Sequence, residues 1–178
     1  MRKSLVLALL LLATPCVAAP SELDKLFAQL AKAETAEDAK PIETKITGLF
    51  RRSGSATVDL LMTRVDAALA ADDKPAARKL IASVTGIAPG YAEGWHARAA
   101  IQAEASDDSA AMASLQKVVQ LNPRQFEAMV ELGSMLEEYG DKAAALKLYR
   151  RALALNPRME GATRKVRALT VSVEGRDI

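Results

Sequence analysis

The sequence has few of the residues that most enzymes use for catalysis. Its 178 residues include one histidine, His96, and one cysteine, Cys16, and aromatic residues make up only 4% of the chain. It has neither a glycine run that would cradle a phosphate nor a zinc-binding spacing such as His-Glu-x-x-His. A lone histidine is more often a contact or solvated residue than a general base. We therefore expect no catalytic residue, no metal site and no cofactor.

Long apolar runs are also missing, except for a short one near the start of the chain. The run from Leu5 to Ala13 follows two basic residues and is about half as long as a membrane-spanning helix. Pro15 and the small residue Ala18 come next, and this layout is typical of a secretory signal peptide. We predict a signal peptide over residues 1–18 and no transmembrane segment in the mature chain. Lipid attachment at Cys16 is the alternative, and it is disfavoured because Pro15 occupies the bond that would be cleaved.

The mature chain also lacks an excess of either charge. Loss of Arg2 and Lys3 with the leader leaves 22 basic and 22 acidic residues, so the mature chain is formally neutral. The basic character of the precursor is therefore no sign of nucleic-acid binding, and we expect no nucleic-acid partner. Cys16 also lies in the leader, so we expect no disulfide even in an oxidising compartment.

What the sequence does have is alanine, leucine and a regular spacing of prolines. Half of the residues are apolar, and the alanines and leucines among them favour helices, so the sequence predicts an all-α fold. Pro89, Pro123 and Pro157 are each 34 residues apart, and each follows apolar residues at helical spacing. The apolar positions of these segments align at i, i+4, i+7 and i+10 as Ala77, Ile81, Val84 and Ile87; Ala111, Leu115, Val118 and Leu121; and Ala145, Tyr149, Ala152 and Leu155.

Another helix-forming segment precedes each of these within the period. Its inward positions recur at i, i+4 and i+7 as Leu61, Val65 and Ala68; Trp95, Ala99 and Gln102; and Met129, Gly133 and Leu136. Between the two segments Asp73, Asp107 and Asp141 stand at matching places, where each would cap the second helix. The proline that follows restricts the residue before it to extended conformations and so ends that helix. Each unit is thus predicted as helix, tight turn, helix.

A 34-residue helix-turn-helix period resembles the tetratricopeptide repeat, or TPR. The unit 126–159 carries Leu132, Gly133, Gly140, Tyr149 and Pro157 at the positions typical of that family. The units 92–125 and 58–91 keep the same phase, with growing divergence toward the N-terminus. The resemblance implies a solenoid, a right-handed superhelix of helix pairs, with an inner groove that binds other proteins.

Three strings resemble a group of small secreted bacterial TPR proteins of the periplasm. They are SGSATVDLLM, YAEGWHARAA and the tail VEGRDI. This second resemblance implies a periplasmic location and no known catalytic role.

Helical patterns continue on both sides of the three repeats. Ser21 and Thr35 would cap two helices within residues 19–57, which we interpret as a degenerate helix pair. A final capping helix is predicted within residues 160–178, where Ala162, Val166 and Leu169 lie on one face. Terminal helices of this kind shield the open ends of a repeat stack. The sequence therefore predicts about nine helices.

By resemblance, one face of the first helix in each unit lines the partner-binding groove. Apart from one histidine, the candidate residues are acidic, apolar or small: Asp59, Met62, Asp66, Glu93, His96, Ala100, Glu104, Glu127, Val130, Ser134 and Glu137. This mixture favours an extended or helical partner segment with basic and apolar residues, while a merely solvated acidic face is the alternative. The groove lacks the Lys, Asn and Arg side chains with which some TPR domains clamp a free carboxylate, so an acidic C-terminus is not expected there.

Two functions of different kinds follow from this sequence. The first is a non-catalytic periplasmic adaptor that binds a peptide or partner domain in its groove and supports assembly or integrity of the cell envelope. The alternative is a structural or self-associating envelope component that acts through its end or convex surfaces. This alternative allows the protein to form a homo-oligomer.

Overall fold

The computed structural model describes residues 20–175, and this part of the chain forms nine α-helices. The prediction of an all-α fold is confirmed. The predicted signal peptide, residues 1–18, lies outside the described residues, and so do residues 176–178. Between residues 20 and 175 no helix combines the length and the apolar character needed to cross a membrane.

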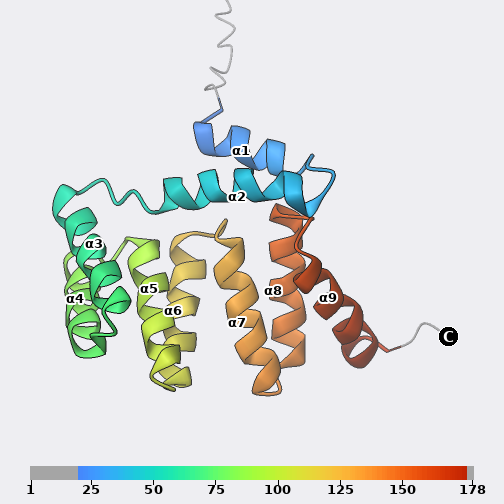
Figure 1. Ribbon diagram of the computed structural model, residues 1–178. Coiled ribbons are helices and arrows are strands. Elements are labelled where there is room, and N and C mark those ends of the chain that lie inside the picture. The colour runs from blue at the N-terminus through green and yellow to red at the C-terminus, as the bar shows by residue number, and fades with distance from the viewer. Residues whose placement is uncertain (1–19, 176–178) are drawn as a thin grey trace, which may run out of the picture.

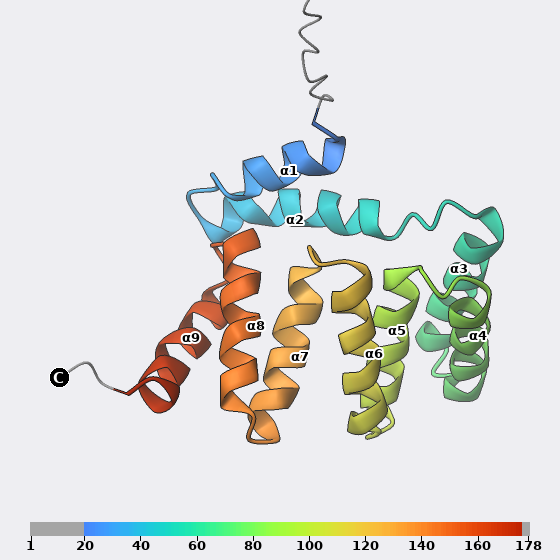
Figure 2. The same ribbon diagram turned by 180° about the vertical axis from the view of Figure 1, so that it is seen from behind.

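Six of the helices form three consecutive pairs, one in each predicted repeat. The pairs stand side by side in a row (Figure 1, Figure 2). They are α3 (Ala56–Ala70) with α4 (Lys74–Ile87), α5 (Ala92–Glu104) with α6 (Asp108–Leu121), and α7 (Phe126–Glu138) with α8 (Lys142–Leu155). Helix α9 (Glu160–Val173) packs on α8 at one end of the row, and α3 and α4 form the other end (Figure 1).

The turn inside each pair has the same construction. Asp72, Ser106 and Gly140 are 34 residues apart and all have positive φ angles, which turn the chain out of the first helix. The next residue is an aspartate, whose carboxylate accepts a backbone N–H bond three residues later and so caps the second helix. The predicted caps of α4, α6 and α8 are therefore confirmed; they are Asp73, Asp107 and Asp141.

The second helix of each later pair ends where the proline period predicts. Helices α6 and α8 stop just before Asn122 and Asn156, which have extended backbones. The side-chain oxygen of each asparagine accepts the N–H of the arginine two residues later, at 3.1 Å for Arg124 and 3.2 Å for Arg158. The repeated sequence Leu-Asn-Pro-Arg is thus a self-bonded turn that leads into the next helix.

The aligned columns of the second helices form much of the core. Their first three positions are buried in every repeat: Ala77, Ile81 and Val84; Ala111, Leu115 and Val118; and Ala145, Tyr149 and Ala152. In the third repeat Gly133 of α7 faces Tyr149 of α8, and a methyl group on Gly133 would lie 3.0 Å from the ring. The absence of a side chain therefore lets these two helices approach closely.

The two N-terminal helices, α1 (Glu22–Leu30) and α2 (Ala36–Phe50), each begin with a capping box. The Ser21 hydroxyl accepts the Asp24 N–H, and the Asp24 carboxylate accepts the Ser21 N–H in return. Thr35 and Asp38 repeat this arrangement at the start of α2. Both predicted caps are confirmed.

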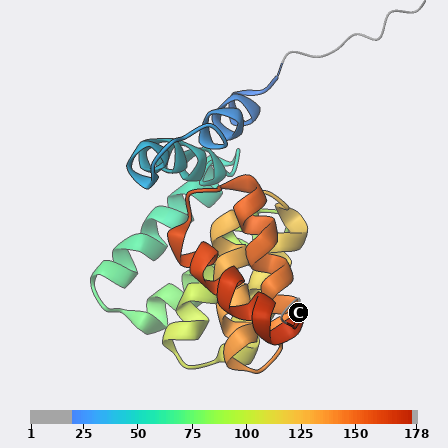
Figure 3. The ribbon, with the colours of Figure 1, turned by 90° about the vertical axis from the view of Figure 1, so that its right-hand side faces the viewer.

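The position of this helix pair differs from the prediction. The sequence suggests a degenerate pair that continues the row and shields its end. Instead, α1 and α2 lie across the ends of α5 to α8, over the turns that join successive repeats (Figure 1, Figure 3). Leu30 and Ile46 are fully buried there, in one core with residues of α5 to α8. The pair takes this place because its apolar face matches the apolar surface at those turns, beside Phe126.

The two Leu-Asn-Pro-Arg turns hold the pair in place. Arg124 Nη1 donates to Asp24 Oδ1 at 2.6 Å, and its guanidinium lies 3.9 Å from the centre of the Phe27 ring. Arg158 Nε donates to the carbonyl oxygen of Ala33, in the turn between α1 and α2, at 2.6 Å. Each turn therefore contributes one arginine to the docking of α1 and α2.

The first repeat has the sequence Ile-Ala-Pro-Gly at the equivalent turn. Its Ile87 is 61% exposed, whereas the aligned Leu121 and Leu155 are half-buried. Leu155 packs against the core that includes α1 and α2. The prediction that Ile87 belongs to the packed column is therefore wrong, because α1 and α2 cover the third turn and leave the first one exposed.

Candidate functional site

Helices α5 and α7, the first helices of the second and third repeats, have a mainly apolar pocket between them. Its volume is about 370 Å³. It is lined by Ala99, Ala100, Ala103, Leu115, Glu131, Ser134 and Met135. The small side chains in this set leave space for an apolar side chain of a partner.

A cluster of charged residues around His96 adjoins this pocket through Glu131. His96 Nε2 lies 2.9 Å from Glu131 Oε2, and His96 Nδ1 lies 3.9 Å from Glu93 Oε2. The buried side chain of Gln125 donates to Glu93 at 3.2 Å and fixes that carboxylate. Because His96 is on α5 and Glu131 on α7, the cluster joins two neighbouring repeats.

The carboxylates decide the protonation of His96. Burial lowers the pKa of His96, but the hydrogen bonds to Glu131 and Glu93 raise it by more, to about 10. Burial raises the pKa of the nearby Glu127, while the imidazolium of His96 acts in the opposite direction. His96 is therefore charged at neutral pH, and carboxylates outnumber it, so the cluster remains acidic.

Helix α2 forms another side of the same surface. A pocket of about 380 Å³ between α2 and α7 is lined by Lys40, Glu43, Thr44, Thr47, Gly48, Arg51 and Glu127. A smaller pocket of about 240 Å³ shares Gly48 and Arg51 and extends to α3. We call the surface made by these three pockets and the His96 cluster the groove.

Five of the predicted residues lie at the centre of the groove. Glu93 and His96 belong to the charged cluster, and Glu127 lines the pocket beneath α2. Ala100 and Ser134 are exposed and line the pocket between α5 and α7.

Two predicted acidic residues lie at the α3 end of the groove, and both are already bonded. Asp59 accepts the Ser53 hydroxyl at 2.6 Å and closes the turn before α3. Asp66 forms an ion pair with Arg51 at 2.5 Å. Both residues line the small pocket, but their carboxylates hold the end of α2 to α3.

Four predicted residues contribute less surface to a partner than the sequence suggests. Met62 is only 7% exposed and belongs to the core of the first repeat. Val130 is partly buried between two apolar clusters.

The other two are glutamates that pair away from His96. Glu104 pairs with Lys74 at 3.0 Å. Glu137 pairs with Lys165 at 3.0 Å and accepts the Tyr149 hydroxyl at 3.1 Å. Neither carboxylate joins the His96 cluster.

Sequence reasoning missed three residues of the groove. Glu131 lies one helical turn after Glu127 on α7, so helical spacing was enough to find it. Gln125 belongs to the turn before α7 and has no pattern of its own. Glu43 of α2, which accepts the Asn156 amide at 2.6 Å, depends on the crossing of α2 over the repeats, and no local spacing indicates that crossing.

The groove combines features that are common on surfaces that bind other chains. A histidine that keeps its proton up to about pH 10 is a poor general base at neutral pH. Across residues 20–175 no three His, Cys, Asp or Glu side chains are grouped so as to hold a metal ion. An apolar pocket beside a cluster with an excess of carboxylates favours recognition of another chain.

Comparison with known sequences gives a partial match. No known family model matches the chain. A TPR repeat-containing protein of Rhizobium etli is 37% identical over 79 residues, which are 44% of this chain and 39% of that protein. The chain therefore matches well under half of the length of this relative.

Comparison with solved structures covers more of the chain. The MamA protein superposes with a TM-score of 0.60 at 16% identity, over 87% of this chain and 84% of that one. The first TPR of Spaghetti (RPAP3), bound to an HSP90 peptide, gives 0.59 at 18% identity, over 66% of this chain and 93% of that one. These likenesses confirm the TPR fold. The finer resemblance to secreted periplasmic proteins stays a prediction.

Proposed function

We propose that this chain, whose described residues have the TPR fold, is a non-catalytic scaffold whose groove binds a segment of another protein. TPR domains mediate protein interactions, and the RPAP3 domain with the same fold is bound to a peptide. The observation that carries the proposal is the contact between the apolar pocket and the acidic cluster, which share Glu131. The partner segment then places an apolar side chain in the pocket and a lysine or arginine beside it.

The surroundings of Glu127 favour a partner segment that contains a basic side chain. The Glu127 carboxylate lines the pocket beneath α2, and among residues 20–175 it makes no hydrogen bond or ion pair. Burial raises the pKa of Glu127, because its carboxylate is only partly solvated. A basic side chain from a partner would add to the positive charge that His96 supplies near Glu127.

The test uses a library of short peptides and variants that fill the pocket. Ala100→Lys with Ser134→Lys blocks the pocket and reverses its charge preference, while Ala113→Lys with Gln116→Lys changes two exposed residues of α6 as a matched control. The wild-type protein should select peptides that combine Lys or Arg with Leu, Ile or Met. Their affinity should fall about tenfold or more in the Ala100/Ser134 variant and stay unchanged in the control.

The variant Glu127→Gln tests the contribution of the acidic part of the proposed site separately from that of the apolar pocket. It should reduce the preference for basic residues without removing the preference for an apolar one. Selection of peptides without either feature, or equal binding by the pocket-filled and wild-type proteins, would contradict the proposal.

We also propose that the protein acts in the periplasm, in assembly or integrity of the cell envelope. The support is the layout of residues 1–18, with two basic residues, a short apolar run and small residues near the end. Fractionation of cells and N-terminal sequencing of the protein test this location. A cytoplasmic protein that retains Met1 would contradict it.

A second candidate function, self-association through the ends of the row, has its own support. Large exposed apolar side chains occur at both ends: Leu60 and Ile87 on α3 and α4, and Val171 and Val173 on α9. Copies joined end to end would cover them. Sedimentation at increasing concentration should then show oligomers that Leu60→Lys abolishes. A monomer at all concentrations would reject this function.

A further inference from the structure

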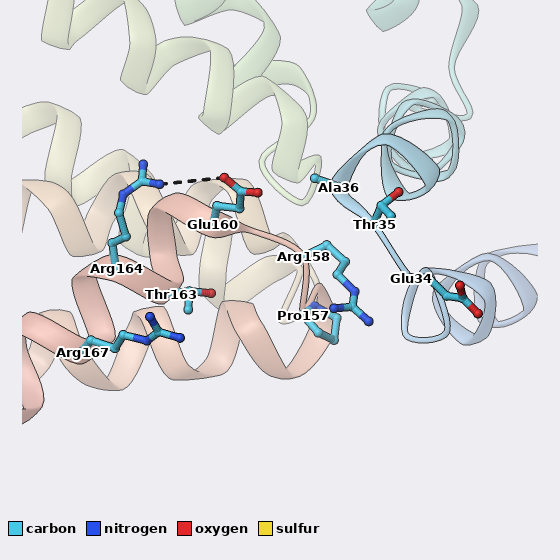
Figure 4. A pocket seen from close by; sticks show the side chains of 9 residues that line it. All are labelled: Glu34, Thr35, Ala36, Pro157, Arg158, Glu160, Thr163, Arg164 and Arg167. Carbon is cyan, nitrogen blue, oxygen red and sulfur yellow. Dashed lines mark ion pairs between the residues drawn. The ribbon is translucent and has the colours of Figure 1, made fainter.

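An open pocket of about 560 Å³ lies outside the groove, between the turn that joins α1 to α2 and the first half of α9. Figure 4 shows three arginine side chains around it. Arg158 precedes α9 and lies beside the α1–α2 turn, whereas Arg164 and Arg167 extend from α9 itself. Two glutamates, Glu34 and Glu160, also line the pocket. Cations therefore outnumber anions here, which is the opposite of the His96 cluster.

The guanidinium groups of this pocket are mostly free to bind a ligand. Arg158 uses Nε to hold the Ala33 carbonyl, and this bond fixes the side chain while its two Nη atoms remain available. Arg164 lies 3.9 Å from Glu160, and both side chains are about three-quarters exposed. Arg167 makes no hydrogen bond or ion pair within the described residues.

Internal ion pairing distinguishes these arginines from their neighbour Lys165. That lysine lies on the same helix but forms a 3.0 Å ion pair with Glu137 of α7. The fold therefore uses Lys165 to attach α9, and it leaves Arg164 and Arg167 without such a role. Because α1 and α2 dock beside Arg158, the pocket is formed before any ligand arrives.

We propose that this pocket binds an acidic segment of a protein partner. The planar guanidinium group donates two parallel bonds to a carboxylate, so arginines suit Asp and Glu side chains. Glu34 and Glu160 repel a compact multivalent anion such as phosphate more strongly than single carboxylates spread along a chain, and they offer acceptors for the backbone N–H groups of that chain. The protein then carries two sites of opposite charge preference, and this one does not depend on the proposed function of the groove.

The experiment measures binding of a fluorescent peptide rich in Asp and Glu, compared with the same peptide carrying Asn and Gln. The full chain is compared with Arg164→Gln/Arg167→Gln and with a control, Lys147→Gln/Arg151→Gln, on the exposed side of α8. Both double variants remove two positive charges, so their net charges match.

The acidic peptide should bind the full chain, and its affinity should fall about tenfold in the Arg164/Arg167 variant. The control should change it by about twofold or less, because distant surface charges are screened. Equal losses in both variants, or equal binding of the Asn/Gln peptide, would overturn the proposal. Competition by inorganic phosphate as strong as that by the unlabelled acidic peptide would overturn it as well, because the pocket would then be a small-anion site.

Discussion

Gly133 is the residue at which α7 lies against the ring of Tyr149. Alanine is normally favoured over glycine inside a helix by about 1 kcal/mol. Here the added methyl group would lie 3.0 Å from the ring, which is too close for an unstrained contact. Tyr149 is only 1% exposed and its hydroxyl is bonded to Glu137, so the ring has no room to move away.

We therefore expect Gly133→Ala to lower the free energy of unfolding by about 1–2 kcal/mol, because overpacking outweighs helix propensity. Gly161 in α9 is the matched control, since a methyl group there meets no atom within 4 Å. Gly161→Ala should raise the free energy of unfolding by about 0.5–1 kcal/mol. Urea unfolding of the two variants measures both values. A stabilising Gly133→Ala substitution would show that the helices can separate without loss.

His96 makes the stability of the protein depend on pH. Its pKa of about 10 in the folded chain is above the value of 6.5 for a free histidine. The folded state therefore binds a proton that the unfolded state loses, and the stabilisation is complete below pH 6.5 and disappears as pH rises toward 10. We expect unfolding free energy to decline across this range in the wild type and more weakly in His96→Gln. Titration of His96 near pH 6.5 by NMR would disprove this expectation.

At the scale of helices, α1 and α2 act as one unit that spans the repeats. Phe27 of α1 meets Phe126 of α7 edge to face, with ring centres 6.2 Å apart. Arg124 forms an ion pair with Asp24, and its guanidinium lies over the Phe27 ring. The turns between repeats thus supply both the apolar and the charged part of this interface.

We expect the double variant Arg124→Ala/Arg158→Ala to loosen α1 and α2 while α3 to α9 stay folded. The ion pair of Arg124 is partly exposed, so the loss should be modest, about 1–3 kcal/mol for both substitutions together. Amide hydrogen exchange should speed up within residues 22–50 and change little within α5 to α8. Arg151→Ala, at an exposed position on α8, should leave exchange unchanged. Equal acceleration in all helices would mean that the arginines stabilise the repeats themselves.

Much of this element-level structure could be predicted from the sequence because it depends on residues a few positions apart. The capping aspartates, the proline stops and the helix starts at Ser21 and Thr35 are all of this kind. The docking place of α1 and α2 could not be predicted in the same way. Asp24 and its partner Arg124 are 100 residues apart, and Ala33 and Arg158 are 125 apart, so no local pattern links them.

At the scale of the whole molecule, part of the groove also depends on local spacing and part on contacts between distant residues. The pocket between α5 and α7 follows from the 34-residue period, because small side chains such as Ala100 and Ser134 recur on neighbouring first helices. The pocket beneath α2 exists only because that helix crosses the row. The local sequence pattern therefore does not indicate that Glu43 belongs to the groove. Burial of Met62 likewise depends on how the first pair packs with α5.

The crossing of α1 and α2 also changes how this chain must fold. In an open repeat array each unit touches only its neighbours, so folding can start anywhere and spread along the chain. Here α1 and α2, which are synthesised before the repeats, bury Leu30 and Ile46 in a core completed by residues of α7 and α8, more than 75 positions later. Such distant contacts slow folding, since a long loop must close before they form. An apolar surface made early therefore stays uncovered until the third repeat has been made, and this exposure favours aggregation of the growing chain.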